Sequence, residues 1–397
     1  MDRAEPVNRS LLHRTTCALA CALLLLSAPP AAAGPREQAR RLHDRLVGLP
    51  PDAATLDAMA ARIASGDALG AAYLAMQDPA FYGTSLKNWV TPWTNVERTV
   101  FADLNDYTAT VIGMVRDDVP FTEVLSADRV YVGAPGVVAP GYSHTDNDHY
   151  RELELQRVNL GDPTLLVPVQ QSTLPGSQLV ASETAGVLTT RAAGLAFFSA
   201  GTNRRMWRFT ATNFLCRDME ELKDISRPVD RIRQDVSRSP GGDSTIFQNS
   251  CSGCHSGMDA VAGAFAYFEF DEAQQRVVHT RGVVQPKYLI NANVFPQGWI
   301  SVDDRWDNYW RSGPYASLGW RGPDSGGFGP KSLGREVTAS RAFSLCQVDK
   351  AFEQVCFHGP SSAAELAERE RIADVFEAQA YSLKRVFAEV AASCRGN

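Results

Sequence analysis

Beyond its first 33 residues the sequence has no apolar run long enough to cross a membrane, which takes about 20 residues, and it has no internal repeat or low-complexity tract. It also lacks an excess of positive charge, since 39 Lys and Arg stand against 45 Asp and Glu. This mildly acidic balance argues against nucleic acid or an anionic membrane surface as the main partner. Hydrolase triads and nucleotide-binding loops are missing too, so the sequence predicts no catalytic residues.

The first 33 residues have the pattern of a secretory signal peptide. Three arginines precede a short apolar run that ends at Leu26, and Ala31-Ala32-Ala33 fits a cleavage site with small side chains. The run is too short for a transmembrane helix. We therefore expect an exported protein, periplasmic or secreted, with no integral membrane segment after cleavage.

The most specific motif in the chain is Cys251-Ser252-Gly253-Cys254-His255. C-x-x-C-H is the attachment sequence of c-type haem. Two thiols at this spacing can each form a thioether to one porphyrin, and the next histidine can bind the iron. The sequence therefore predicts one covalently attached haem c, with Cys251 and Cys254 as anchors and His255 as the proximal iron ligand. A zinc half-site or a simple disulfide pair are the alternatives.

The second axial ligand is open, because no methionine follows Met258 and that residue lies too close to His255 to reach round the porphyrin. His279 is a possible distal ligand. Met206, Met219 and His358 are further candidates, each with a plainer interpretation as a core or surface residue. The remaining possibility is an iron whose distal side is open.

Groups around the haem can be proposed from spacing alone. His255 needs an acceptor for its second ring N–H. A backbone carbonyl is the common solution, and Asp259, four residues on, is the other candidate unless it only caps a helix. Arg204, Arg205 and Arg208 could pair with haem propionates, although a solvated helix face is the favoured interpretation.

Four further cysteines follow the signal peptide, namely Cys216, Cys346, Cys356 and Cys394. Their even number in an oxidising compartment predicts two disulfides. Cys346 and Cys356 fall on one helix-period pattern over residues 335–357, which would hold them about 15 Å apart. They cannot bond each other at that distance, so Cys216 and Cys394 should each pair with one of them.

The fold class expected is mainly α. Residues 34–239 are predicted to form a helical domain of unknown role with a loop-rich segment near 130–190, and residues 240–397 a cytochrome c-like α-helical haem domain with C-terminal helices. Helices are expected over 36–47, 55–64, 96–115 and around Leu383–Val390, and Ser362 with Glu365 forms a capping box for another.

The chain resembles a group of exported bacterial c-type cytochromes related to the planctomycete-type cytochrome c domain proteins. The resemblance rests on Cys251 to Asp259, in which an aspartate stands four residues after the histidine, and on the aromatic stretch that ends Phe268-Glu269-Phe270-Asp271. It extends over roughly residues 80–394. It implies a haem domain joined to a helical domain and supplies no substrate.

The leading functional hypothesis is an exported monohaem cytochrome that carries electrons to and from a periplasmic redox partner protein. Two alternatives stay open. One is a haem enzyme, peroxidase-like or oxygenase-like, with an open distal site. The other is a haem-based sensor or docking protein.

Overall fold

The computed structural model describes residues 33–199 and 203–396, and the predicted signal peptide lies, except for Ala33, outside the described residues. The protein is mainly helical with small sheets, as the sequence predicts. The α-helices are α2 (Pro35–Val47), α3 (Ala53–Ala64), α4 (Ala68–Ala75), α5 (Lys87–Val90), α6 (Asp106–Arg116), α7 (Asp148–Leu155), α8 (Arg191–Phe197), α9 (Arg204–Leu215), α10 (Ser244–Ile246), α11 (Ser252–Ala262), α12 (Gly329–Thr338), α13 (Arg341–Cys356), α14 (Ala363–Ala378) and α15 (Leu383–Ser393).

Three two-stranded antiparallel sheets interrupt the helices. They pair β1 (Val130–Gly133) with β2 (Leu166–Val169), β3 (Phe268–Asp271) with β4 (Arg276–His279), and β5 (Arg305–Asp307) with β6 (Gly326–Phe328). A two-stranded sheet is barely stable by itself. Each therefore depends on a helix, as β1 does on α6 and β4 on α8.

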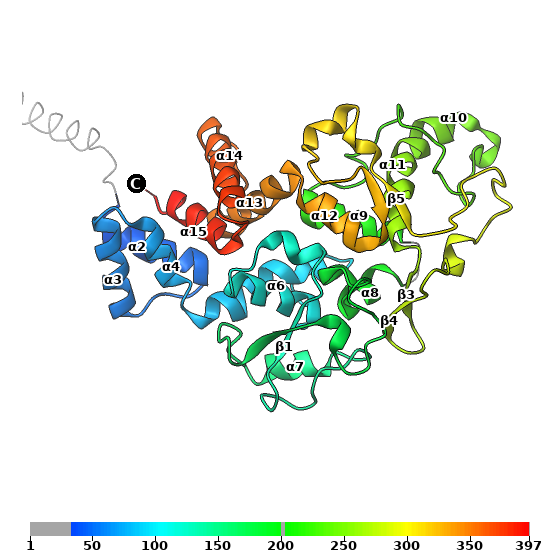
Figure 1. The fold of residues 1–397 in the computed structure, drawn as a ribbon. Helices are drawn as coiled ribbons and strands as arrows, with labels where there is room; N and C mark the ends of the chain where they lie inside the picture. The colour runs from blue at the N-terminus through cyan, green and yellow to red at the C-terminus, as the bar shows by residue number, and fades with distance from the viewer. Residues whose placement is uncertain (1–32, 200–202, 397) are drawn as a thin grey trace, which may run out of the picture.

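The first and last helices of the described chain, α2 and α15, lie side by side (Figure 1). Helix α15 packs on α2 and α4, and α13 and α14 complete this group. Further along the molecule α11 packs on α9 and β5. The predicted boundary at residue 239 stays a prediction, but packing does cross it, because residues after 240 contact the first part of the chain in both places.

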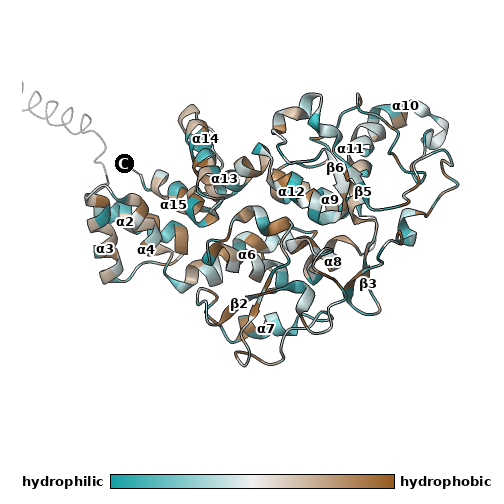
Figure 2. Cartoon of the chain, viewed as in Figure 1, coloured by the Kyte–Doolittle hydropathy of each residue, from teal (hydrophilic) through white to brown (hydrophobic). Residues whose placement is uncertain are grey.

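The apolar stripes of the terminal helices meet in one core. Hydrophobic and hydrophilic residues alternate around α2 to α4 (Figure 2), and the buried side chains Leu42 and Leu46 mark the inner face of α2. The ammonium group of Lys350 in α13 is enclosed by aromatic rings, with Nζ 2.9 Å from the centre of the Trp93 ring, and donates to the carbonyl of Asn213 at 2.8 Å. The cation–π contact joins α13 to the turn that follows α5, and the hydrogen bond joins α13 to α9.

One predicted helix begins later than its apolar pattern indicates. We expected a helix over 96–115, whereas α6 begins at Asp106. The cause is local: Asn105 accepts the backbone N–H of Thr108 at 2.9 Å and so caps the helix there. Phe101, which lies within the segment predicted to be helical, is 92% exposed. The predicted helix over 335–357 is likewise two helices, α12 and α13, separated by the cap residue Ser340.

Two disulfides join distant parts of the chain. Cys216 pairs with Cys346 and Cys356 with Cys394, at Cα–Cα distances of 5.3 and 5.7 Å. Both pairings agree with the exclusion of a Cys346–Cys356 bond, since those residues do lie on one helix, α13. The first bond fixes α13 to the end of α9, and the second fixes α13 to α15.

Removing each disulfide should lower stability by an amount that follows the length of the loop it closes. The sequence separations are 130 and 38 residues. In the chain-entropy description, replacing Cys216 and Cys346 together with serine should therefore cost about 1 kcal/mol more than replacing Cys356 and Cys394, within a total of about 2–5 kcal/mol each. Urea unfolding of the two double variants measures this difference. A larger loss from the shorter loop would contradict the entropic explanation.

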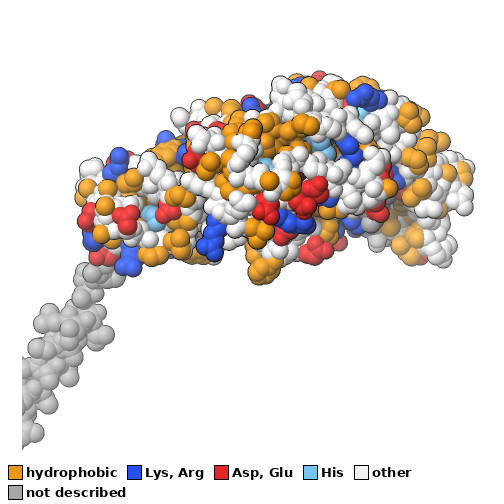
Figure 3. All heavy atoms as spheres, turned by 90° about the horizontal axis from the view of Figure 1, so that it is seen from below, with side chains coloured by type: hydrophobic (Ala, Val, Ile, Leu, Met, Phe, Trp, Pro, Cys, Tyr) orange, Lys and Arg blue, Asp and Glu red, His pale blue; other side chains and the backbone are white. Residues whose placement is uncertain are grey.

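The charged surface is mixed in sign. Figure 3 shows one face of the molecule, on which acidic and basic side chains lie next to each other among hydrophobic ones. Among the described residues, no helix combines the length and the apolar character that crossing a membrane requires.

Candidate functional site

The motif residues lie on one face of α11. Cys251 ends the π-helical turn η7 (Phe247–Cys251), and α11 begins at the next residue. Residues at positions i, i+3, i+4 and i+7 share a helix face. Cys251, Cys254, His255 and Met258 occupy these positions, and all four are partly accessible. The residues between them and the following Asp259 are buried. We call these four residues the α11 stripe.

The other faces of α11 are fixed by close packing. A Cβ atom on Gly257 would lie 2.4 Å from the Trp310 ring, and one on Gly253 would lie 2.6 Å from the Lys223 side chain. Trp310 donates to the carbonyl of Leu222 at 3.1 Å and stacks on Trp207 of α9. Two glycines thus let the helix approach its neighbours closely, and the α11 stripe is held facing outward.

His255 has a partner on one ring nitrogen. Its Nδ1 lies 3.2 Å from Oδ1 of Asp259, one helical turn further on. A proton on Nδ1 donated to this carboxylate leaves Nε2 as the unprotonated nitrogen. The His255 side chain is 22% exposed. Of the two roles considered for Asp259, acceptor for His255 or helix cap only, the geometry confirms the first.

Asp259 is the centre of a buried ionic network. Arg204 binds it with two nitrogens, at 2.5 Å from Nε and 2.8 Å from the terminal nitrogen, and the backbone N–H of Arg233 donates at 3.1 Å. Burial alone would raise the pKa of the Asp259 carboxyl, but the charge and hydrogen bonds of Arg204 outweigh it and hold that pKa far below its usual range. The network therefore presents His255 with a permanent anion.

The two motif thiols are not bonded to each other or to another described cysteine. The Sγ atom of Cys254 lies 3.5 Å from the carbonyl oxygen of Met219, and burial raises the pKa of this thiol. All four remaining cysteines of the described residues are in disulfides. Cys251 and Cys254 thus remain available for bonds to another group.

The possible distal ligand His279 lies in a different part of the fold. Strand β4 packs on β3 and α8, whereas α11 packs on α9 and β5. The His279 ring contacts the Phe268 ring, with centroids 4.6 Å apart, and its Nδ1 is 3.2 Å from Glu183. Burial lowers the pKa of His279. The structure does not bring His279 into contact with His255, and its distal role stays a prediction.

The other distal candidates occupy ordinary structural positions. Met206 is buried in α9, and the Met219 side chain is also buried. His358 follows α13 on the surface, where its Nδ1 contacts the carbonyl of Gly359 at 2.9 Å. No distal ligand can be assigned from these contacts.

A cluster of arginines lies at the far end of the α11 stripe. Met258 lines a cavity of about 440 Å³ together with Arg98, Arg204, Arg205 and Arg208. Arg204 pairs with Asp259 and Asp235, and Arg208 pairs with Asp218 at 2.6 Å. Arg98 and Arg205 form no ion pair with any carboxylate of the described residues. Arg98, which our prediction missed, comes from the loop before α6, and nothing in its sequence neighbourhood marks it.

In the part of the chain that the structure describes, no three His, Cys, Asp or Glu side chains are arranged to hold a bare metal ion. Comparison of the chain with known protein families, with curated proteins and with solved structures finds no match. Functional conclusions therefore rest on the geometry of the α11 stripe and its surroundings.

Proposed function

We propose that this protein carries one haem c, bound covalently through Cys251 and Cys254 with His255 as the proximal iron ligand, and that it transfers electrons as an exported monohaem cytochrome. The observation that carries the proposal is the α11 stripe. A helix that is buried on every other side leaves accessible the two thiols, the imidazole and the thioether that a haem would cover. The periplasmic redox partner protein and the exported location belong to the same proposal.

The surrounding residues fit such a group. Haem supplies reversible one-electron chemistry at its iron. Asp259 holds the His255 ring through the contact with Nδ1 and would make the imidazole more basic, which would stabilise an oxidised iron and lower its reduction potential. Arg98, which forms no ion pair among the described residues, could pair with a carboxylate group beyond Met258. Of the arginines predicted from the sequence, Arg204 and Arg208 already pair with aspartates, and Arg205 also lines a second, neighbouring groove.

A haem enzyme with an open distal site is the second candidate. The observation that favours it is the placement of the four distal candidates, because Met206 and Met219 are buried, His279 contacts Glu183, and His358 lies on the surface after α13. A sensor or docking role would use the same open iron.

A reduced absorption spectrum of the exported protein, recorded with and without carbon monoxide, tests these alternatives. We expect c-type haem bands that the gas leaves unchanged, because a six-coordinate iron has no free position. Bands that shift readily with carbon monoxide would show an open distal site and would favour the haem enzyme or the sensor over the electron carrier. In the unshifted case, His279→Ala measures whether His279 is the sixth ligand. The absence of covalent haem from correctly exported protein would refute both.

A further inference from the structure

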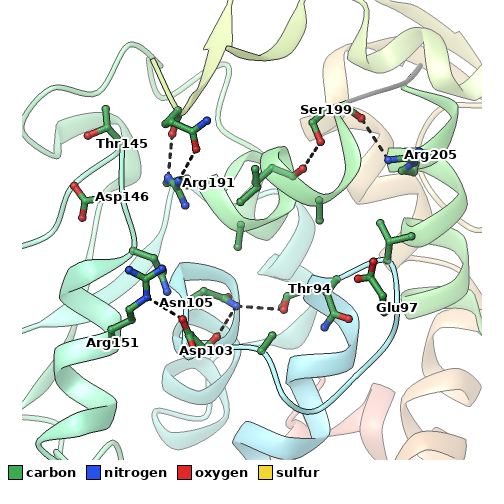
Figure 4. A pocket seen from close by; sticks show the side chains of 18 residues that line it. Thr94, Glu97, Asp103, Asn105, Thr145, Asp146, Arg151, Arg191, Ser199 and Arg205 are labelled. Atoms are coloured by element: carbon green, nitrogen blue, oxygen red, sulfur yellow. Dashed lines mark hydrogen bonds and ion pairs between the residues drawn. The ribbon is translucent and has the colours of Figure 1, made fainter. Parts of the chain in front are cut away.

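A second, larger groove lies beside the arginine cavity. It has a volume of about 740 Å³ and lies between the loop before α6, the start of α7, and helices α8 and α9 (Figure 4). Pockets of this size accommodate small organic molecules. The groove shares Val96 and Arg205 with the cavity beside Met258. No motif in the sequence indicated it.

Two guanidinium groups in this groove form no direct ion pair within the part of the chain that the structure describes, and neither do the Glu97 and Asp146 carboxylates that also line it. Arg191 donates to the backbone carbonyl of Gln275 at 3.0 Å and to its side-chain oxygen at 3.3 Å, while Arg205 donates to the carbonyl of Ser199 at 3.4 Å. Neither has a carboxylate partner among residues 33–199 and 203–396. The third arginine of the groove, Arg151, is neutralised by Asp103 at 2.9 Å and Asp148 at 2.7 Å. Figure 4 shows Arg191 and Arg205 on opposite sides of α8.

The rest of the lining combines a small apolar surface with hydrogen-bonding groups. Ala192, Leu195 and Ala196 form the α8 side, and Leu195 is 42% exposed. Across from them Thr145 and Asp146 come from the loop before α7. Asp146 has no ion pair within the described chain. Its Oδ1 accepts the backbone N–H of Asp148 at 3.1 Å, and the carboxylate can accept further hydrogen bonds from hydroxyl groups.

We propose that this groove binds a polyhydroxylated organic acid, specifically a sugar acid of one or two rings. The two carboxylates of a two-ring acid would pair with Arg191 and Arg205, for which planar carboxylates are the best partners. The hydroxyl groups would donate to Asp146 and its neighbours, and the apolar face of a ring would cover Ala192 and Leu195. A neutral sugar leaves both guanidinium groups unpaired, and an aliphatic acid leaves Asp146 unpaired. The proposal goes beyond electron transfer and does not depend on the haem.

Calorimetric titration of the full-length exported protein tests the proposal, with digalacturonate as the sugar acid, maltose as a neutral disaccharide and glutarate as an acid without hydroxyl groups. We expect digalacturonate to bind at least tenfold more tightly than either of the others. Arg191→Gln and Arg205→Gln should each weaken binding by about tenfold or more, because a charge-assisted hydrogen bond is lost. Arg208→Gln removes the same charge outside the groove and should leave binding unchanged.

The proposal is overturned if digalacturonate does not bind, if maltose or glutarate binds equally well, or if Arg208→Gln weakens binding as much as Arg205→Gln. Circular dichroism of each variant identifies loss of fold. The haem absorbance of the same samples separates the two proposals, because a protein without haem that still binds digalacturonate contradicts only the proposed cytochrome function.

Discussion

Replacing Cys251 and Cys254 together with serine is expected to abolish covalent haem while the exported protein remains folded. Both thioether bonds would need these sulfurs, since the other four described cysteines are consumed in disulfides. Both side chains are partly accessible, so exchanging sulfur for oxygen leaves no buried polar group unpaired. Each single variant should retain one thioether at most. Mass spectrometry of the denatured protein measures the bound haem directly.

The matched control is the double variant Cys216→Ser with Cys346→Ser. It removes the same number of cysteines at a distance from the α11 stripe and should keep covalent haem while losing the stability that the disulfide provides. Covalent haem that survives in the Cys251 and Cys254 double variant would show that another residue attaches it. Loss of haem from both double variants would point to a general folding defect instead.

Replacing Asp259 with alanine should give the largest destabilisation of any single change at the site, about 3–5 kcal/mol, because it removes one of the two carboxylates that pair with the buried Arg204. It also removes the acceptor for the His255 ring and for the Arg233 backbone N–H. Arg204 would retain only Asp235, and its side chain is 14% exposed. The matched control is Asp218→Ala, which breaks the more exposed pair with Arg208, whose side chains are 36% and 54% exposed. That pair should contribute at most about 1 kcal/mol. Urea unfolding at pH 7 measures both, and equal losses would contradict the buried network.

The contribution of Asp259 to the free energy of unfolding should also decrease in acid. Its pKa is depressed in the folded protein, so the stabilisation is fully present above the unfolded-state pKa, about 3.9 for aspartate. It declines as the pH falls below that value towards the folded-state pKa. The difference in unfolding free energy between the natural protein and Asp259→Ala should therefore shrink as the pH is lowered from 5 to 2. A difference that grows in acid would refute this interpretation.

The same variant has a second readout on the haem. Without the Asp259 carboxylate the His255 ring loses its hydrogen-bond acceptor and part of its basicity, so we expect the reduction potential to rise. Restoring an acceptor with Asp259→Glu should recover part of the shift. A purely structural role of Asp259 would leave the potential unchanged.

Local features of the fold could be predicted because neighbouring residues determine them. The Ser362–Glu365 capping box forms as predicted at the start of α14, and both disulfides join pairs that helix geometry allowed. The start of α6 could not be predicted from apolar spacing. The helix begins where the Asn105 side chain accepts the Thr108 backbone N–H and caps it, and the apolar pattern extends further towards the N-terminus. Helix α7 was missed, since its short sequence lies within a region rich in glycine and proline.

The candidate site also contains features that the local sequence determines and features that depend on tertiary folding. Asp259 could be identified as a partner of His255 because four residues make one helical turn. Arg204 and Asp235 could not be placed with it, since they approach from α9 and from the loop before α10 only after folding. The groove lined by Arg191 and Arg205 had no sequence motif, because its residues come from five separate segments.

The long disulfide loop has a consequence for the order of events during synthesis. Cys216 is made 130 residues before its partner Cys346, and a chain grows at about 5–20 residues per second. Outside the predicted signal peptide, the other cysteines made before Cys346 are Cys251 and Cys254. Early capture of these two by another group would remove the wrong partners before the right one emerges. If haem attachment comes first, it would therefore prevent incorrect disulfides between Cys216 and the two motif cysteines.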